Sequence, residues 1–185
     1  MNTLVTGGSG LVGSCITGTH KPRSSDVNLL DFDSVLSYIK DNDIRQIIHC
    51  AARVGGVKEN TDKPGEFFYE NTQMTLNILE AARICNVEKV VCVLSTCIFP
   101  AEATYPITTD QIHLGEPHKS NYGYGYAKRM TEVNARAYRD QYGMNIVTVV
   151  PCNVYGKGDN FNVSSSHVIP GLIHKYYLAS RDDTD

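Results

Sequence analysis

The chain has 185 residues and a formal net charge of −3. This length suits one domain with a substantial core. The lysines and arginines are scattered, so no basic stripe indicates a nucleic-acid partner. No apolar run approaches the roughly 20 residues that cross a bilayer, so we expect no membrane partner. Because a strand-like pattern begins almost at Met1, we also expect no signal peptide.

The six cysteines form no C-x-x-C pair and have no metal-ligand spacing with histidine, so we expect no metal site. Three of them, Cys50, Cys92 and Cys152, lie within or just after strand-like runs. We interpret these as buried free thiols of a cytoplasmic protein, because disulfides are rare in that compartment.

Short apolar strands alternate with amphipathic helices along most of the chain. Strands are predicted at residues 3–6, 45–52, 89–94 and 145–150. Helices are predicted at about 34–41, at 66–85 and at 122–142, the last with Gly143 as its C-cap. A polar loop follows at 101–121, and a loop at 161–166 leads into a helix from His167 to about Leu178. This alternation predicts an α/β fold with a doubly wound parallel sheet.

A glycine-rich segment follows the first strand and precedes a helix start: Gly7, Gly8, Ser9, Gly10, Leu11, Val12 and Gly13. Such a turn lets the backbone approach a pyrophosphate, whose charge is favoured by the free N–H groups of the helix N-terminus. A flexible turn without a ligand is the alternative on the motif alone. The position of the motif after the first strand favours dinucleotide binding.

The crossover after this turn is unusually short. Gly18 and Pro22 leave about one turn of helix after Gly13, and no β-branched run occupies residues 21–30. The second strand, which usually carries the residue that binds the adenosine ribose, is therefore not apparent. Arg23, Ser24 and Ser25 are either contacts for a 2′-phosphate, which would favour NADP over NAD, or a solvated loop.

Two side chains with reactive groups, Ser95 and Cys97, follow the strand at 89–94. Ligands of open α/β sheets bind beyond the carboxyl ends of such strands, so both residues lie where chemistry is expected. A buried inert thiol is the alternative for Cys97.

Tyr124 and Lys128 are four residues apart at the start of a predicted helix and share one face. An ammonium near a phenol favours the phenolate, so we expect Lys128 to lower the pKa of Tyr124 and make it an acid/base near neutral pH. Lys128 is also a candidate contact for the nicotinamide ribose. Tyr122 and Tyr126 have no basic residue four positions later, so the spacing selects Tyr124.

Together these motifs resemble the extended short-chain dehydrogenase/reductases, and within them the GDP-L-fucose synthase family. The matching stretches are H-C-A-A-R-V-G-G (49–56), L-S-T-C-I-F-P (94–100), Y-G-Y-A-K-R-M (124–130) and the run from Asp159 to Lys175. The resemblance implies a Rossmann-like, cytoplasmic, usually homodimeric enzyme of GDP-fucose biosynthesis. Such an enzyme epimerises C3 and C5 of GDP-4-keto-6-deoxy-D-mannose and then uses NADPH to reduce the C4 ketone, giving GDP-L-fucose.

The resemblance also implies roles for individual residues. Ser95 corresponds to the serine that binds the C4 carbonyl, Tyr124 to its proton donor and Lys128 to the partner of the tyrosine. Cys97 and His167 correspond to the epimerisation base and acid. Asn153 and Lys175 correspond to substrate contacts. The implied NADP(H) contacts are Gly7, Gly8, Ser9, Gly10, Leu11, Val12, Gly13, Ala51, Ala52, Lys128, Pro151, Asn153, Val154 and His167.

The same resemblance implies an NADP-binding domain at residues 1–159 and the start of a substrate-binding domain at 160–185. Against it, the first helix and second strand are compressed, and we expect the substrate domain to be truncated. Two alternatives therefore stay open. One is a non-catalytic Rossmann-like fragment that dimerises through the helices at 66–85 and 122–142. The other is a related sugar-nucleotide epimerase or dehydratase, which the pairing of Cys97 with His167 disfavours.

Overall fold

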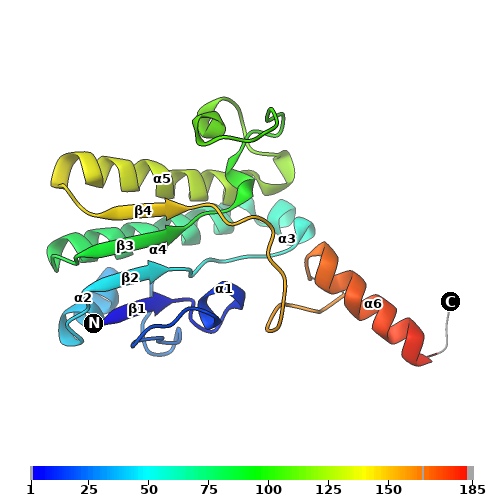
Figure 1. Ribbon diagram of the computed structural model, residues 1–185, viewed down its shortest axis with the longest axis horizontal. Coiled ribbons are helices and arrows are strands. Elements are labelled where there is room, and N and C mark those ends of the chain that lie inside the picture. The colour runs from blue at the N-terminus through cyan, green and yellow to red at the C-terminus, as the bar shows by residue number, and fades with distance from the viewer. Residues whose placement is uncertain (1, 164, 183–185) are drawn as a thin grey trace.

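The computed structural model describes residues 2–163 and 165–182, and its centre is a parallel sheet (Figure 1). Four strands pair in the order β1-β2-β3-β4 in this part of the chain. Their bounds are β1 (Thr3–Thr6), β2 (Gln46–His49), β3 (Lys89–Val93) and β4 (Ile146–Val149). The register aligns one buried row across the sheet, Leu4, Ile47, Val90 and Ile146. The predicted parallel, Rossmann-like sheet is confirmed.

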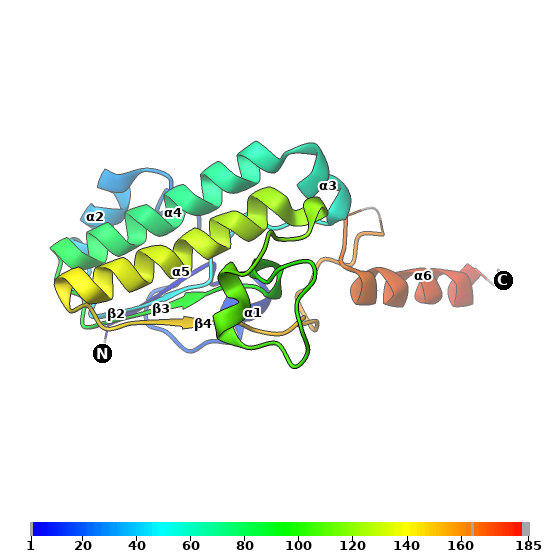
Figure 2. The same ribbon diagram turned by 90° about the horizontal axis from the view of Figure 1, so that it is seen from above.

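Three helices lie side by side on one face of this sheet (Figure 2): α2 (Phe32–Asp41), α4 (Pro64–Ile84) and α5 (Tyr122–Tyr142). Their apolar faces cover the buried row, with Ile39, Ile78 and Ala135 among the side chains in contact. Asp31 begins α2 by accepting hydrogen bonds from two backbone N–H groups of its first turn. Gly143 ends α5 in the left-handed conformation (φ 65°), as predicted.

The other face of the sheet is sparsely covered. In the described part of the chain, no helix comparable to α4 or α5 lies over it (Figures 1 and 2). Ile146 of β4 points into the core. Val147 and Val149, whose side chains point to the opposite face, are 41% and 40% exposed. The second helical layer of a doubly wound sheet is therefore slight here.

The compressed crossover after β1 is visible in detail. Helix α1 (Leu11–Ser14) is a single turn, as predicted. The expected second strand is reduced to one parallel bridge between Leu4 and His20 at the edge of β1, where the Val5 N–H donates to His20 O (2.8 Å). The next residue, Lys21, donates from Nζ to the carbonyl oxygens of Gly13 (3.1 Å) and Ser14 (3.2 Å). A lysine side chain thus caps the carbonyls that a longer helix would have used.

The remaining elements surround the carboxyl ends of the strands. Helix α3 (Val57–Asp62) was not predicted, and the polar loop contains short 3₁₀ helices, η2 (Thr109–His113) and η3 (Lys119–Asn121). A third, η1 (Thr96–Ile98), follows β3 directly. Helix α6 (Val168–Asp182) runs further than predicted and projects away from the sheet (Figure 1).

Among the cysteines, Cys92 is buried, Cys50 is half-buried and Cys152 is exposed. The prediction for Cys152 was wrong because β4 ends at Val149 and leaves Cys152 in the following loop. All six thiols are free. Among the described residues, no helix is long and apolar enough to cross a membrane, and no group of three His, Cys, Asp or Glu side chains could hold a metal ion.

Candidate functional site

Four segments meet at the carboxyl edge of the sheet: the glycine-rich turn after β1, the turn after β3, the start of α5 and the loop after β4 (Figure 1). Thr96 Oγ1 donates to Asn153 Oδ1 (3.3 Å), which joins the turn after β3 to the loop after β4. A Cβ at Gly156 would lie 3.9 Å from Leu11 Cδ1, so the same loop reaches the glycine-rich turn. Parallel strands bring these segments together because all their carboxyl ends share one edge.

Ser95 and Cys97 lie in one tight turn. Ser95 is the N-cap of η1, and its hydroxyl accepts a hydrogen bond from the Cys97 N–H (3.3 Å). The start of α5 packs directly on this turn, because a Cβ at Gly125 would lie 2.7 Å from the Cys97 carbonyl oxygen. Only glycine allows that approach, so the glycine beside Tyr124 fixes how near the helix lies to Ser95.

Tyr124 and Lys128 of α5 lie against the end of β3 and the turn that contains Ser95. The Lys128 Nζ donates to Val93 O at the end of β3 (2.9 Å) and lies 6.0 Å from the centre of the Tyr124 ring. Ser95, Tyr124 and Lys128, which the sequence predicts as one constellation, are therefore brought together.

The expected lowering of the Tyr124 pKa was wrong for this structure. Burial, with the Cys97 thiol nearby, raises the pKa of Tyr124 to about 12, and the hydrogen bond with Ser95 offsets this only in part. Burial lowers the pKa of Lys128 to about 8. The four-residue spacing places the ammonium near the phenol, but it does not indicate that both groups are buried. In the folded chain the effect of burial on each pKa is larger than the effect of neighbouring groups.

A group of side chains that was not predicted packs against Tyr124. The fully buried Phe67 ring meets the Tyr124 ring edge-on, with 6.5 Å between centres. The Arg53 guanidinium lies over the Phe67 ring, 5.0 Å from its centre, and pairs with the carboxylates of Glu66 (2.7 Å) and Glu70. Arg53 belongs to the stretch at 49–56, but nothing in its spacing indicates that Phe67, Glu66 and Glu70 of α4 surround it.

The glycine-rich turn has the shape that a dinucleotide pyrophosphate requires. Gly7 adopts a left-handed φ of 66° and packs on the backbone of Ala51 at the end of β2. Gly10 is exposed, and a Cβ there would meet only Gly7 O, so the space outside the turn is open. The residues present therefore fit the diphosphate of a nicotinamide cofactor.

The segment after Lys21 forms a turn that Asp26 closes. Arg23 donates its backbone N–H to Asp26 Oδ2 (2.8 Å), and Ser25 donates to Asp26 Oδ1 (3.1 Å). Asp26 thus occupies the turn that Arg23, Ser24 and Ser25 form, while these three side chains stay exposed. Both interpretations of this segment, a 2′-phosphate contact and a solvated loop, are compatible with that exposure.

His167 and Lys175 lie at the periphery. His167 immediately precedes α6, and Lys175 lies within it, both exposed. No hydrogen bond or ion pair described for residues 2–163 and 165–182 joins His167 to Cys97. The segment before His167 does approach the site, because Ser165 and Ser166 line a depression with Gly56 and the residues of α3. The structure thus brings Asn153 to the turn after β3 but leaves His167 and Lys175 outside contact with it.

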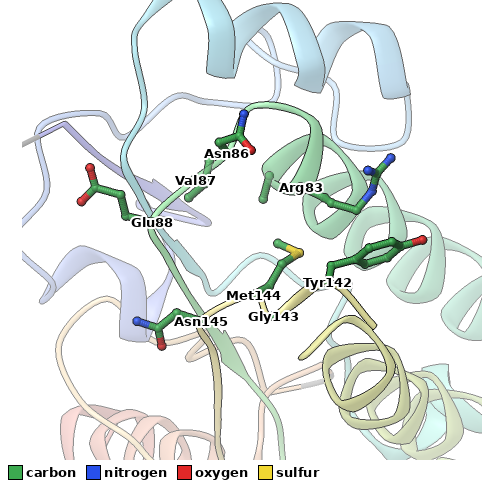
Figure 3. Close-up of a pocket in the computed structure, with 9 residues that line it drawn as sticks. Arg83, Asn86, Val87, Glu88, Tyr142, Gly143, Met144 and Asn145 are labelled. Carbon is green, nitrogen blue, oxygen red and sulfur yellow. The ribbon is translucent and has the colours of Figure 1, made fainter. Parts of the chain in front are cut away.

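A second depression lies at the opposite end of the sheet, where β3 and β4 begin (Figure 3). The Arg83 guanidinium lies 4.9 Å from the centre of the Tyr142 ring there and already pairs with Glu80 (2.6 Å). Because its cation is neutralised and it lies away from the carboxyl edge, this depression is not the candidate site.

Comparisons with known proteins agree with this geometry. A family model described as "NAD dependent epimerase/dehydratase family" matches residues 3–182. The chain is 47% identical over 193 residues to a GDP-L-fucose synthase of Dictyostelium discoideum, covering 98% of this chain and 60% of that protein. It is 39% identical to a probable GDP-L-fucose synthase of Drosophila melanogaster, with the same two coverages.

Solved structures give the same result. A GDP-L-fucose synthetase of Naegleria fowleri bound to NADP is 38% identical, with a TM-score of 0.86 over 99% of this chain and 63% of that one. These similarities confirm the resemblance found in the motifs. The chain spans about 60% of the length of the curated relatives it matches.

Proposed function

The chain belongs to the NAD dependent epimerase/dehydratase family, and within it we propose that the chain carries the NADP(H)-dependent chemistry of a GDP-L-fucose synthase. The substrate would be GDP-4-keto-6-deoxy-D-mannose and the product GDP-L-fucose. The observation that carries this proposal is the meeting of Ser95, Tyr124 and Lys128 at the carboxyl edge of the sheet, the edge from which the glycine-rich turn also leaves.

The cofactor would lie with its diphosphate on the glycine-rich turn, residues 7–13, and against Ala51 and Ala52. Lys128 would hold the nicotinamide ribose, and residues of the loop after β4, among them Pro151, Asn153 and Val154, would border the nicotinamide. When bound, NADPH supplies the hydride that reduces the C4 ketone. The chain's own contribution is to orient the two reactants and to exclude water from the reacting carbonyl.

Tyr124 is suited to donate a proton to the C4 oxygen. Because burial raises its pKa to about 12, the phenol holds its proton at neutral pH and is a donor to a carbonyl. Ser95, one hydrogen bond away, supplies a second donor to the same oxygen, as in an oxyanion hole. In the reduction the Tyr124 proton would pass to the C4 oxygen, and the ammonium of Lys128 would stabilise the phenolate that remains.

The same pair of donors serves the epimerisation. A C–H bond next to the ketone is acidified when the enolate oxygen is held by Ser95 and Tyr124. The thiolate form of Cys97 would take the proton from C3 or C5 while the electron pair of the broken C–H bond moves into the enolate, and His167 would return a proton to that carbon on the opposite side. The hydrogen bond between the Cys97 N–H and the Ser95 hydroxyl supports the role of Cys97, because it keeps the two residues in one turn. His167 would have to move toward the site together with the start of α6.

We also propose that Asn153 contacts the sugar and that Lys175, within residues 160–185, contacts the GDP diphosphate. A cytoplasmic location is consistent with six free thiols. A homodimer is supported by the apolar side chains that α4 and α5 expose, among them Phe68, Leu76 and Val133.

Turnover of NADPH by the purified chain tests the proposal. With GDP-4-keto-6-deoxy-D-mannose, Tyr124→Phe should reduce the rate at least about 100-fold and leave the NADPH dissociation constant within twofold. Tyr122→Phe, an exposed tyrosine of the same helix turn, is the matched control and should keep the rate. A wild-type chain that does not oxidise NADPH with this substrate contradicts the activity. Turnover of UDP-sugars instead would favour a related epimerase or dehydratase.

A further inference from the structure

Four buried polar side chains form a continuous chain of contacts between β1 and α5: Thr6, His49, Thr75 and Thr131. Each is at most 3% exposed. His49 is the centre of this chain, with Nδ1 2.8 Å from Thr6 Oγ1 and Nε2 3.4 Å from Thr75 Oγ1. Thr75 Oγ1 in turn lies 3.3 Å from Thr131 Oγ1. Polar groups this deep are costly unless paired, so the contacts define one arrangement of the core.

The hydrogen-bond partners assign the tautomer of His49. Thr6 Oγ1 already accepts the Ala51 N–H (3.3 Å), so its own proton is available to the imidazole. If Nδ1 carried the ring proton, the Thr6 hydroxyl would have no described acceptor. With the proton on Nε2, Thr6 donates to Nδ1, His49 donates to Thr75, and Thr75 donates to Asn71 O (3.1 Å). Every proton in this arrangement has an acceptor.

The imidazole is also neutral. Burial lowers the pKa of His49 to about 3, and the Lys128 ammonium acts in the same direction. A protonated ring would have two N–H donors and no acceptor, so the Thr6 hydroxyl proton would lose the nitrogen that accepts it. The neutral ring keeps both contacts.

The two ends of the chain are the two halves of the candidate site. Thr6 immediately precedes Gly7, and through Ala51 it also fixes the end of β2. Thr131 lies one turn after Lys128 on α5, and its hydroxyl is the donor in the contact with Thr75 Oγ1 (3.3 Å), with Ala127 O (3.3 Å) as a competing acceptor. The glycine-rich turn and the Tyr124–Lys128 pair belong to elements that do not adjoin in the sheet. The chain centred on His49 therefore links the element that leads into the glycine-rich turn to the element that carries Tyr124 and Lys128.

We propose that His49 is a positioning residue, a neutral imidazole that sets the separation between the glycine-rich turn and α5 and thereby the affinity for the cofactor. The inference rests on the proposed function, because the cofactor it concerns is the one assigned to the glycine-rich turn. It adds a residue that touches neither the cofactor nor the substrate.

NADPH titration of His49 variants tests the positioning role. His49→Leu removes both contacts and should raise the NADPH dissociation constant about tenfold, whereas His49→Gln, with an acceptor and a donor, should stay within threefold. Val90→Ala is the matched control, because Val90 is fully buried in the same sheet and takes no part in the chain. It should lower stability and leave the affinity unchanged. An NADPH dissociation constant for His49→Leu within twofold of the wild-type value overturns the inference.

Further measurements decide the question if His49→Leu does not fold or the wild-type chain does not bind NADPH. Thr75→Val should weaken NADPH binding several-fold while Thr75→Ser restores it, and equal affinities would overturn the inference.

Without any cofactor, ¹⁵N spectra of wild type should show the His49 proton on Nε2, and Thr75→Val should speed hydrogen exchange at the Ala51 amide. A proton on Nδ1, or unchanged exchange, overturns the inference. Absence of NADPH binding by wild type contradicts the proposed function instead.

Discussion

Tyr124 and Lys128 show how burial reverses an expectation based on spacing. Four residues of helix bring an ammonium to a phenol, which in water would favour the phenolate. In the folded chain both groups are buried, and burial shifts each pKa in the direction that favours the uncharged form. The result is a protonated tyrosine at neutral pH, which suits a proton donor better than a base.

His49 makes the stability of the fold depend on pH. Its pKa is about 3 in the folded chain, against an ordinary value of 6.5, so below pH 6.5 the unfolded chain binds a proton that the folded chain does not. The free energy of unfolding should therefore fall as the pH decreases from 6.5 toward 3, with a slope that approaches about 1.4 kcal/mol per pH unit.

Urea unfolding of wild type and His49→Gln at pH 5, 6 and 7 checks this. The variant should lose the part of the slope that His49 contributes between pH 6.5 and 5. Glu80, whose pKa is lowered from 4.5 by Arg83, adds its own loss only in more acidic solution and is unchanged in the variant. Parallel pH profiles for the two proteins would show that His49 titrates normally in the folded chain.

The start of α5 depends on glycine for its close packing. A Cβ at Gly125 would lie 2.7 Å from both Cys97 O and Pro117 Cβ. Gly125→Ala should therefore cost about 1–3 kcal/mol of stability, since overpacking outweighs the better helix propensity of alanine. It should also reduce turnover, because the strain falls between Cys97 and Tyr124.

Gly65→Ala provides the control for this substitution. Gly65 lies in the first turn of α4, and a Cβ there meets nothing within 4 Å. The change should be neutral or stabilise the fold by about 0.4–1 kcal/mol. Thermal or urea unfolding of the two variants gives the comparison, and a Gly125→Ala protein as stable as Gly65→Ala would contradict the packing argument.

The long elements were predictable because periodicity accumulates over many residues. The 21-residue helix α5 was predicted with its observed ends, and the four strands are correct within a few residues. Helix α3 and the Leu4–His20 bridge are too short to give a period. The role of Lys21 was not predicted because its ammonium donates to carbonyl oxygens seven and eight residues earlier in the chain, a contact that no local pattern indicates. The grouping of Ser95, Tyr124 and Lys128 could be predicted from motifs. The contacts of Phe67 with Arg53 and Tyr124, and those of His49 with Thr6 and Thr75, join distant parts of the chain, and no sequence motif indicates them.

Among residues 2–163 and 165–182, three exposed apolar areas are candidates for an interface. One lies on α4 and α5, one on the sheet face at Val147 and Val149, and one along α6. Exposed apolar area of this extent marks interaction surfaces. The α4–α5 area belongs to the two longest helices of the described chain, which are packed against each other (Figure 2). We expect two copies of the chain to associate through this area.

Two matched substitutions distinguish the helix face from the sheet face. Val133 on α5 and Val147 on β4 are both 41% exposed, so replacing either with glutamate adds the same charge at the same exposure. If two copies associate through α4 and α5, Val133→Glu should halve the mass of wild type measured by light scattering after size exclusion, because a charge in a desolvated interface is strongly unfavourable. Val147→Glu should leave the dimer intact. A monomeric wild-type chain, or a dimer that only Val147→Glu dissociates, would contradict association through these helices.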